Sequence, residues 1–127
     1  MGKVIIDTDI LIDFLRGKQQ AKDVLDSFSE DDMPCCSVIT VAEIRAGMHP
    51  SEESDTMSLL NSLEHLVIDK EIALLAGKLK QDAVDRHLEL DDCFIAATAL
   101  HYRATLLTHN PKRYPYKDLD IKPAKYI

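Results

Sequence analysis

The stretch VIIDTDILIDFLRG, residues 4–17, places two carboxylates one residue apart directly after an apolar run. This apolar run, within residues 3–7, is short and predicts a buried β-strand that ends on Asp7. Burial of a carboxylate at the end of such a strand is unfavourable in free energy unless the carboxylate is paired or binds a ligand. Asp9 stands just before the helix expected from Ile10, where it would serve as the N-cap. We therefore interpret Asp7 as a functional side chain and Asp9 mainly as a structural one.

Strand-like runs alternate with longer helical patterns along the rest of the chain. The runs expected to form strands are residues 3–7, 35–39, 66–69 and 104–108, with an edge strand at 120–123. The segments expected to be helical are residues 10–15, 19–29, 40–48, 55–66, 70–86 and 91–103. Such alternation is typical of an α/β domain with a parallel central sheet flanked by helices. In sheets of this kind, ligands bind beyond the carboxyl ends of the strands.

Length and composition predict a single domain that spans residues 1–127. The chain is 46% hydrophobic and 29% charged, which is the composition of an ordinary globular domain able to bury a core. It has no apolar run long enough to cross a membrane, and its first residues lack the pattern of a signal peptide. The three cysteines, Cys35, Cys36 and Cys93, lie in apolar segments without metal-type spacing. These features predict a cytoplasmic protein with reduced core cysteines.

The formal net charge of −7 argues against general attraction to nucleic acid. Acids gathered in one pocket, however, recruit divalent cations, and these reverse the local field. Residues 109–117 also form a local basic and aromatic segment, which either contacts phosphates and bases or is a solvated loop. Charge alone therefore does not exclude a nucleic-acid substrate.

Further acids are expected at the same edge of the sheet as Asp7. Glu43 follows the second predicted strand, although Thr40 and Glu43 also match the T-x-x-E capping box of a helix start. Asp91 and Asp92 precede a run that is apolar nearly all round, which predicts a buried helix. Capping needs one of these two acids, so we interpret the other as functional.

Thr108 and Asn110 lie at the end of the strand predicted over residues 104–108. Asn110 is either a turn residue before proline or part of the site, and Thr108 beside it would orient a carboxylate or a water. Acids from separate segments that meet at one sheet edge predict a site for Mg²⁺ or Mn²⁺, because these ions prefer oxygen ligands. The five histidines show no ligand spacing, and the four glycines form no phosphate-binding loop.

Four blocks of the chain match a known pattern in order, namely VIIDTDILIDFLRG, SVITVAEIRAG, LDDCFIAATAL and LLTHNPKRY. On these blocks the sequence resembles the PIN-domain nucleases and, within them, the VapC-type toxins of toxin–antitoxin pairs. The matched positions of the family's acids are Asp7, Glu43 and Asp92, with Asp91 and Asn110 as further candidate ligands. Because Asn110 is neutral where some members carry an acid, a second tightly held metal ion is less expected.

The resemblance implies a metal-dependent endoribonuclease that uses Mg²⁺ or Mn²⁺ to hydrolyse RNA. Asp7, Glu43 and Asp92 would be the catalytic metal ligands, and the residues expected behind them are Asp9, Thr108 and Asn110. Candidates for contacts with RNA phosphates are Arg16, Arg45, Lys112 and Arg113. The protein would form a homodimer and would be inhibited by a cognate antitoxin that blocks its active site.

Two other interpretations remain open. A phosphatase of the haloacid-dehalogenase type also carries a D-x-D motif after a strand, with Asp7 as nucleophile and Asp9 as general acid. Against this, Leu11 stands where Thr or Val usually follows, and the acidic pair 91–92 leads into a helix. The second alternative is a PIN domain that has lost catalysis and serves as a binding module.

Overall fold

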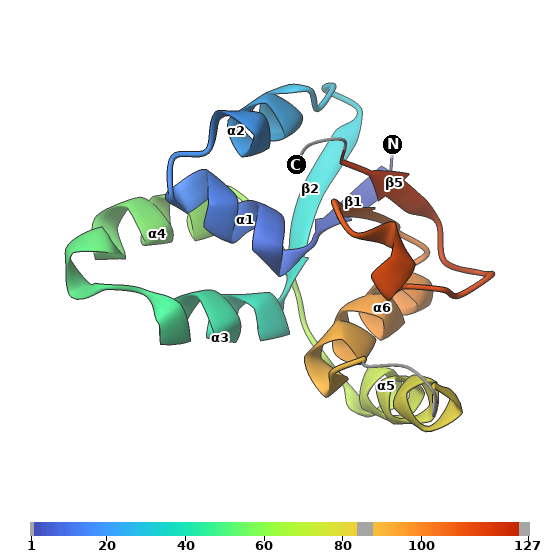
Figure 1. The fold of residues 1–127 in the computed structure, drawn as a ribbon. Coiled ribbons are helices and arrows are strands. Elements are labelled where there is room, and N and C mark those ends of the chain that lie inside the picture. The colour runs from blue at the N-terminus through green and yellow to red at the C-terminus, as the bar shows by residue number, and fades with distance from the viewer. Residues whose placement is uncertain (1, 84–87, 125–127) are drawn as a thin grey trace.

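Five parallel strands form the central sheet in the described part of the computed structural model, residues 2–83 and 88–124 (Figure 1). Their order across the sheet is β3-β2-β1-β4-β5. Their bounds are β1 Gly2–Ile6, β2 Asp32–Ser37, β3 Glu64–Leu66, β4 Thr105–Thr108 and β5 Ile121–Pro123. β1 lies in the middle and pairs with β2 on one side and with β4 on the other. The carboxyl ends of these three strands therefore meet at one edge of the sheet.

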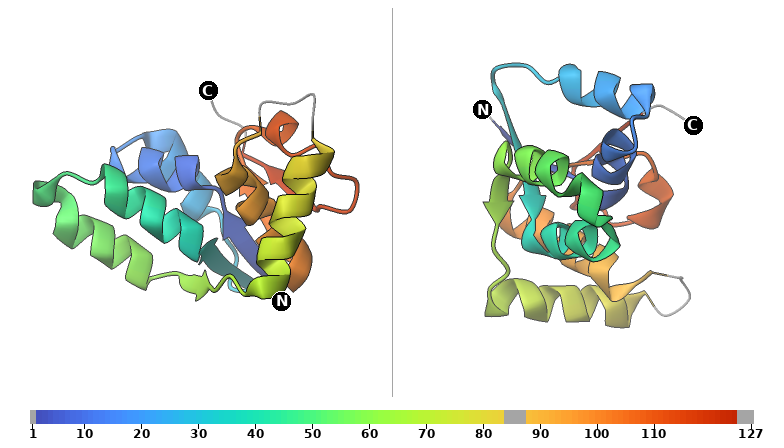
Figure 2. Two further views of the ribbon diagram at one scale, coloured as in Figure 1. Left: turned by 90° about the horizontal axis from the view of Figure 1, so that it is seen from below. Right: turned by 90° about the vertical axis from the view of Figure 1, so that its left-hand side faces the viewer.

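Helices cover both faces of this sheet (Figures 1 and 2). Their bounds are α1 Thr8–Leu15, α2 Gln19–Asp26, α3 Val38–Gly47, α4 Glu53–Asn61, α5 Lys70–Asp82 and α6 Leu90–Tyr102, with short 3₁₀ turns η1 Pro50–Glu52 and η2 Pro111–Arg113. Helices α1 to α4 share one hydrophobic cluster with the sheet, and α6 packs on the other face with α5 outside it. The predicted α/β fold with a parallel sheet flanked by helices is confirmed.

Alternation along β1 divides the core between the two faces of the sheet. Val4 and Ile6 pack into the cluster shared with α1 to α4, whereas Ile5 packs against Ala96 and Ala99 of α6. Successive side chains of a strand point to opposite faces, so a strand covered on both sides reads as continuously apolar. The alanines have no long side chain to hold α6 away from the sheet, and α6 is the buried helix that its apolar run predicts.

The second strand begins and ends earlier than predicted. It spans Asp32–Ser37 rather than 35–39, because Ser37 is the N-cap of α3. The Ser37 hydroxyl accepts a hydrogen bond from the backbone N–H of Ile39 at 3.2 Å. The capping box predicted for Thr40 and Glu43 is therefore wrong, since α3 has already begun at Val38.

Serine hydroxyls also explain why two helices are shorter than predicted. Ser27 donates to the carbonyl of Val24 after α2, and Ser62 donates to the carbonyl of Leu59 after α4. Such local bonds satisfy carbonyls that a further helical turn would need. Glycine ends α1 as predicted, because Gly17 has φ +79°, a left-handed conformation that suits glycine.

The remaining predicted elements are present with shifted bounds. The strand predicted at 66–69 lies at Glu64–Leu66, and α5 is helical as far as Asp82. The end predicted for that helix, residues 84–86, lies outside the described residues. Across residues 2–83 and 88–124, the helices are all too short or too polar to cross a membrane. The three cysteines are buried and carry free thiols.

Candidate metal centre at the carboxyl edge of the sheet

Asp7 lies directly after β1 and is 2% exposed. Its Oδ2 accepts hydrogen bonds from the hydroxyl of Thr108 at 2.8 Å and from that of Tyr114 at 3.2 Å. Burial raises the pKa of Asp7, and the Asp9 charge adds to this, while the Thr108 hydrogen bond and Arg113 oppose it. The two hydrogen bonds thus hold the carboxylate in one orientation. A nearby cation would stabilise its charged form against burial.

Thr108 connects Asp7 to the loop that follows β4. While its hydroxyl donates to Asp7, it accepts from the backbone N–H of Asn110 at 3.0 Å. The predicted role of Thr108 in orienting a carboxylate agrees with this geometry. Asn110 contacts the network through its backbone, so a role for its side chain as a ligand stays a prediction.

Tyr114 is a site residue that the sequence did not indicate, as is Thr8, which donates to Glu43. Tyr114 falls in the basic and aromatic segment 109–117 and ends the block LLTHNPKRY, which gave a weak signal. Its side chain is 1% exposed, so it does not offer a surface for base stacking. Burial and the nearby charges of Asp7 and Asp92 raise the pKa of Tyr114, which keeps its hydroxyl a donor to Asp7.

Glu43 projects from α3 toward Thr8, which follows β1, and toward the first turn of α6. Its Oε1 accepts from the hydroxyl of Thr8 at 2.8 Å, and that hydroxyl also lies 2.8 Å from the hydroxyl of Thr40. Thr40 therefore hydrogen-bonds the residue that holds Glu43 and does not cap the start of α3. Burial raises the pKa of Glu43 to about 8, helped by a hydrogen bond with Asp91 and the charges of Asp91 and Asp92, while Thr8 opposes the rise.

Asp91 and Asp92 both lie in the first turn of α6, whose N-cap is Glu89. Asp91 Oδ1 accepts from the backbone N–H of Asp92 at 3.0 Å, and Asp91 also hydrogen-bonds Glu43. Burial raises the pKa of Asp92 to about 6, Arg113 opposes this, and Asp91 and Asp7 add to it. Asp91 thus connects Glu43 of α3 to Asp92 of α6. Neither Asp91 nor Asp92 is the N-cap of α6.

Asp9 is paired with Arg113 and does not cap α1. Helix α1 begins at Thr8 with Asp7 at the N-cap position, so the cap predicted for Asp9 is wrong. Arg113 Nη1 lies 3.1 Å from Asp9 Oδ2, 3.6 Å from Asp92 Oδ1 and 4.0 Å from Asp7 Oδ2. One guanidinium group thus links carboxylates that come from the end of β1, from α1 and from α6.

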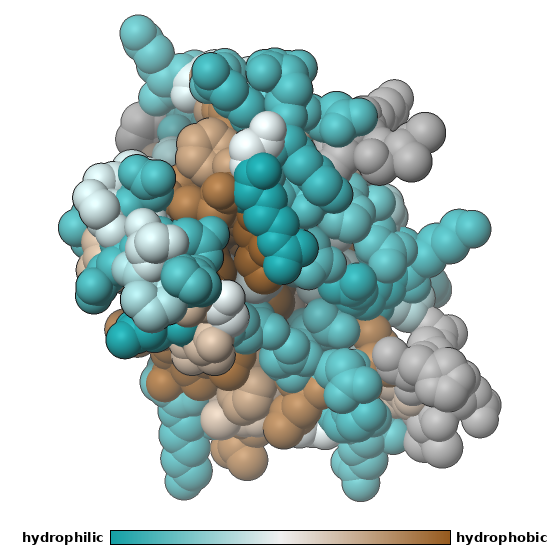
Figure 3. Space-filling view, turned by 60° about the vertical axis from the view of Figure 1, so that its left-hand side comes forward, coloured by the Kyte–Doolittle hydropathy of each residue, from teal (hydrophilic) through white to brown (hydrophobic). Residues whose placement is uncertain are grey.

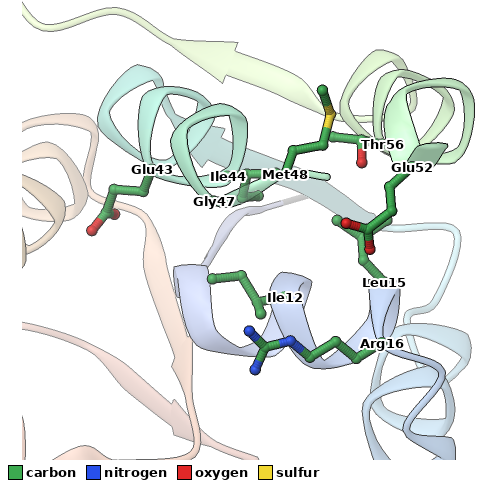
Figure 4. A pocket seen from close by; sticks show the side chains of 9 residues that line it. All are labelled: Ile12, Leu15, Arg16, Glu43, Ile44, Gly47, Met48, Glu52 and Thr56. Atoms are coloured by element: carbon green, nitrogen blue, oxygen red, sulfur yellow. The ribbon is translucent and has the colours of Figure 1, made fainter. Parts of the chain in front are cut away.

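The other predicted phosphate contacts lie at the surface. Arg45 on α3 and Lys112 in η2 are exposed, and Arg16 follows α1. Arg16 and Glu43 both line a groove between α1, α3 and the start of α4, which also contains Ile12 (Figure 4). Contacts of these three basic side chains with RNA stay predictions.

The donor set at this edge fits a hard divalent cation. Asp7, Glu43 and Asp92 come from three segments far apart in sequence, and each carboxyl has a pKa raised by burial. A bound divalent ion would offset that penalty, because it supplies opposite charge to carboxylates whose negative charges raise one another's pKa. Oxygen donors of this kind suit Mg²⁺ or Mn²⁺ rather than softer metals.

A second, exposed group of potential ligands lies elsewhere among the described residues. Asp69, Glu71 and His101 bring their ligand atoms within 4.8 Å of one another. Asp69 already accepts the backbone N–H of Ile72 as the N-cap of α5. His101 is at the opposite end of α6 from Asp92, about 14 Å away along the helix axis. This group is therefore separate from Asp7, Glu43 and Asp92.

The strand order and the buried acids define a parallel α/β domain with a candidate metal centre at its carboxyl edge. The family model described as "PIN domain" matches residues 4–119, so the chain belongs to the PIN-domain family. This membership replaces the haloacid-dehalogenase interpretation of Asp7 and Asp9.

Two curated relatives from Mycobacterium tuberculosis are similar over nearly their full length. Ribonuclease VapC10 is 33% identical over 122 residues, which covers 94% of this chain and 91% of the relative. Ribonuclease VapC19 is 30% identical over 114 residues, or 87% of this chain and 91% of the relative.

Solved structures show the same fold. A chain of a toxin–antitoxin complex from Klebsiella pneumoniae has a TM-score of 0.81 and 28% identity, with 98% of this chain and 99% of that chain covered. A chain of DNA-bound VapBC from Salmonella typhimurium has a TM-score of 0.82 and 19% identity, with 98% and 100% covered. At 19% identity, the second comparison supports the fold alone.

Proposed function

We propose that this protein is a metal-dependent endoribonuclease and the toxin of a toxin–antitoxin pair. The observation that carries the proposal is that Asp7, Glu43 and Asp92 all lie near the carboxyl edge of the sheet, where the charge of Asp92 interacts with Glu43 and that of Asp7 with Asp92. The relatives named as ribonucleases support RNA as the substrate. Mg²⁺ or Mn²⁺ is the proposed cofactor because carboxylate oxygens are the donors available.

A bound divalent ion would supply an activated water and would stabilise the charge that grows on a phosphodiester group. The protein's own residues prepare its ligands. Thr108 and Tyr114 hold Oδ2 of Asp7, and Thr8 holds Oε1 of Glu43. These hydrogen bonds fix the two carboxylates before substrate arrives, so little reorganisation is needed during the reaction.

Glu43 is placed to hold a proton at neutral pH. Because burial raises the pKa of Glu43 to about 8, its carboxyl group exchanges a proton close to the operating pH of most cells. The hydrogen bond with Asp91 gives that proton a second oxygen. Opposite charge nearby favours the ionised form, so binding of a cation should release the proton.

The direct test is RNA cleavage by Asp7→Asn with added Mn²⁺. We expect loss of at least about a thousandfold in rate, because removal of one ligand charge removes the electrostatic stabilisation of the reaction. Asp31→Asn is the matched control, since Asp31 is an exposed acid in the turn before β2. Circular dichroism should show that both variants keep the fold. Full activity in Asp7→Asn would contradict the proposal.

The partner in this proposal is a cognate antitoxin that blocks the acidic site. Solved structures of the same fold include complexes of toxin and antitoxin. On the face formed by α1, α2 and α4, apolar side chains lie in a hollow between hydrophilic neighbours (Figure 3). Residues lining this hollow include Phe14, Leu25, Phe28, Leu59 and Leu63. An apolar hollow suits the apolar side of a folded segment of the antitoxin.

Cell-based and hydrodynamic measurements test the biological part of the proposal. Expression of the wild-type chain in the cytoplasm of a bacterial host should arrest growth of the host, whereas expression of Asp7→Asn should not. Co-expression of the protein encoded beside it should restore growth. Light scattering should give the mass of a homodimer. Growth unaffected by the wild-type chain, together with intact RNA, would favour a binding module without catalysis.

A further inference from the structure

Arg113 places a cationic group among carboxylates of the candidate metal centre. Its Nη1 lies 3.1 Å from Asp9 Oδ2, 3.6 Å from Asp92 Oδ1 and 4.0 Å from Asp7 Oδ2. The Asp7 and Asp92 side chains are 3% and 13% exposed, and that of Arg113 is 28% exposed. Charges in such partly buried surroundings interact more strongly than charges at the surface.

The backbone around Arg113 limits how far its side chain can move. The Arg113 N–H donates to the carbonyl of Asn110 at 3.0 Å within η2. The next residue, Tyr114, is buried and hydrogen-bonded to Asp7. Arg113 is therefore tethered beside Asp7, and a change of its side-chain rotamer is the simple way for the guanidinium to leave.

We propose that Arg113 is an internal counter-ion that competes with the divalent metal for Asp7 and Asp92, and that Asp9 retains it at the site. The inference rests on the proposed function, because it takes Asp7 and Asp92 as metal ligands. A guanidinium 3.6–4.0 Å from the two carboxylates repels any second cation that they bind. Loss of the Arg113 charge should therefore tighten metal binding.

The geometry gives Asp9 a specific part in this competition. Asp9 makes the shortest contact with Arg113, and its side chain is 42% exposed, at the outer side of the cluster. An arginine that turns away from Asp7 and Asp92 can keep its pair with Asp9. The second acid of the DTD motif thus acts on the metal site through Arg113.

Calorimetric titration of Mn²⁺ tests the competition without any measurement of cleavage. We expect Arg113→Gln to lower the dissociation constant for Mn²⁺ by about tenfold, which equals about 1.4 kcal/mol. Lys117→Gln is the matched control, because it removes the same charge from an exposed residue in the following turn. Its dissociation constant should stay within about twofold of the wild-type value, since exposed charges are screened.

Arg113→Lys provides a second variant that retains the charge. The ammonium group of lysine keeps the charge but ends one atom short of the position of Arg113 Nη1, which makes all three contacts. The Mn²⁺ affinity of this variant should therefore lie between those of wild type and Arg113→Gln. If Arg113→Gln does not fold, Arg113→Lys carries the test and must bind Mn²⁺ more tightly than wild type. Unchanged or weaker binding in the folded variant overturns the competition.

Failure of the competition is distinguishable from failure of the proposed function. If wild type binds no Mn²⁺, or if Asp7→Asn binds it as well as wild type does, the metal site itself is wrongly assigned and the competition falls with it. If wild type binds Mn²⁺ and Asp7→Asn does not, the site stands. The affinity of the Arg113 variants then decides the competition alone.

Discussion

Asp7 and Asp9 lie one residue apart but have different partners. Asp7 is buried and held by Thr108 and Tyr114, whereas Asp9 is half-exposed and paired with Arg113. Removal of Asp7 would therefore remove a proposed metal ligand, whereas removal of Asp9 would remove the ion pair that retains Arg113 at the site. The two acids of the motif should respond differently to the same conservative change.

Asp9→Asn should retain the fold and measurable RNA cleavage. Because a pair of this exposure stabilises a protein little, we expect the free energy of unfolding to change by less than about 1 kcal/mol. Urea unfolding and an RNA cleavage assay beside Asp7→Asn check the difference. Loss of cleavage as complete as in Asp7→Asn would show that both acids take part directly.

Glu43 predicts a dependence of stability on pH when no divalent metal is present. The folded-state pKa of Glu43 is raised from 4.5 to about 8, so the folded protein holds a proton that the unfolded chain releases. This contribution is fully present below about pH 4.5 and is lost as the pH rises through about 8. Glu43→Gln cannot lose a proton, so its free energy of unfolding should increase relative to wild type between about pH 5 and pH 9.

Urea unfolding at several pH values, with chelator present, measures this difference. Glu30→Gln serves as the control because Glu30 is an exposed acid in the turn between α2 and β2. Its free energy of unfolding relative to wild type should stay nearly constant over the same range. A constant difference for Glu43→Gln as well would show that burial does not perturb Glu43.

Some site residues were predictable because the local sequence shows acids in apolar segments, where burial of an unpaired charge is unfavourable. An acid that ends an apolar strand needs a reason, and so does a pair of acids before an apolar helix. The pairing of Arg113 with Asp9 joins residues at opposite ends of the chain, and no local pattern reports such a contact. Tyr114 was missed because a tyrosine in a basic, proline-containing segment is usually exposed.

At the scale of elements, the position of α3 determines where Glu43 points. Ser37 caps α3, so the helix begins at Val38 and Glu43 falls in its second turn, facing Thr8. With the predicted start at residue 40, Glu43 would have been occupied with the cap. One hydroxyl group at the end of β2 thus decides whether Glu43 is structural or available to the site.

Ser37→Ala should destabilise the domain by about 1 kcal/mol, the usual cost of losing an N-cap hydroxyl. Thermal or urea unfolding measures the loss. Thr40→Val is the informative comparison, because Thr40 shares its hydrogen bond with Thr8 rather than with the backbone of α3. Greater loss of helix α3, seen by hydrogen exchange, in Thr40→Val than in Ser37→Ala would restore the capping-box interpretation.

Element types were predictable here and exact ends were not. The apolar run through residues 38–39 is compatible with a strand or with a buried helix, and the choice depends on the Ser37 cap. The ends of α2 and α4 depend on serine hydroxyls that turn back to carbonyls in the preceding turn. In contrast, α6 was clear because both its acidic start and its apolar body agree with one helix.

At the scale of the whole molecule, the parallel sheet brings distant acids together. β1 pairs with β2 and β4, so the segments that follow these strands carry Asp7, Glu43 and Asn110 to one edge, and α6 adds Asp92. If these acids hold a divalent ion as proposed, this convergence accounts for action on an anionic polymer by a chain with a net charge of −7. The cation, rather than the overall charge, would provide the attraction.

Asp7, Glu43 and Asp92 should behave as one divalent-metal site. Urea unfolding of wild type and Asp7→Asn, each with and without Mn²⁺, measures whether they do. At Mn²⁺ one hundred times above the dissociation constant, wild type should gain about 2.7 kcal/mol of stability, and Asp7→Asn should gain almost none. Equal stabilisation of both proteins would place the metal elsewhere, for example at Asp69, Glu71 and His101, and would contradict this assignment, as would the absence of any stabilisation of wild type.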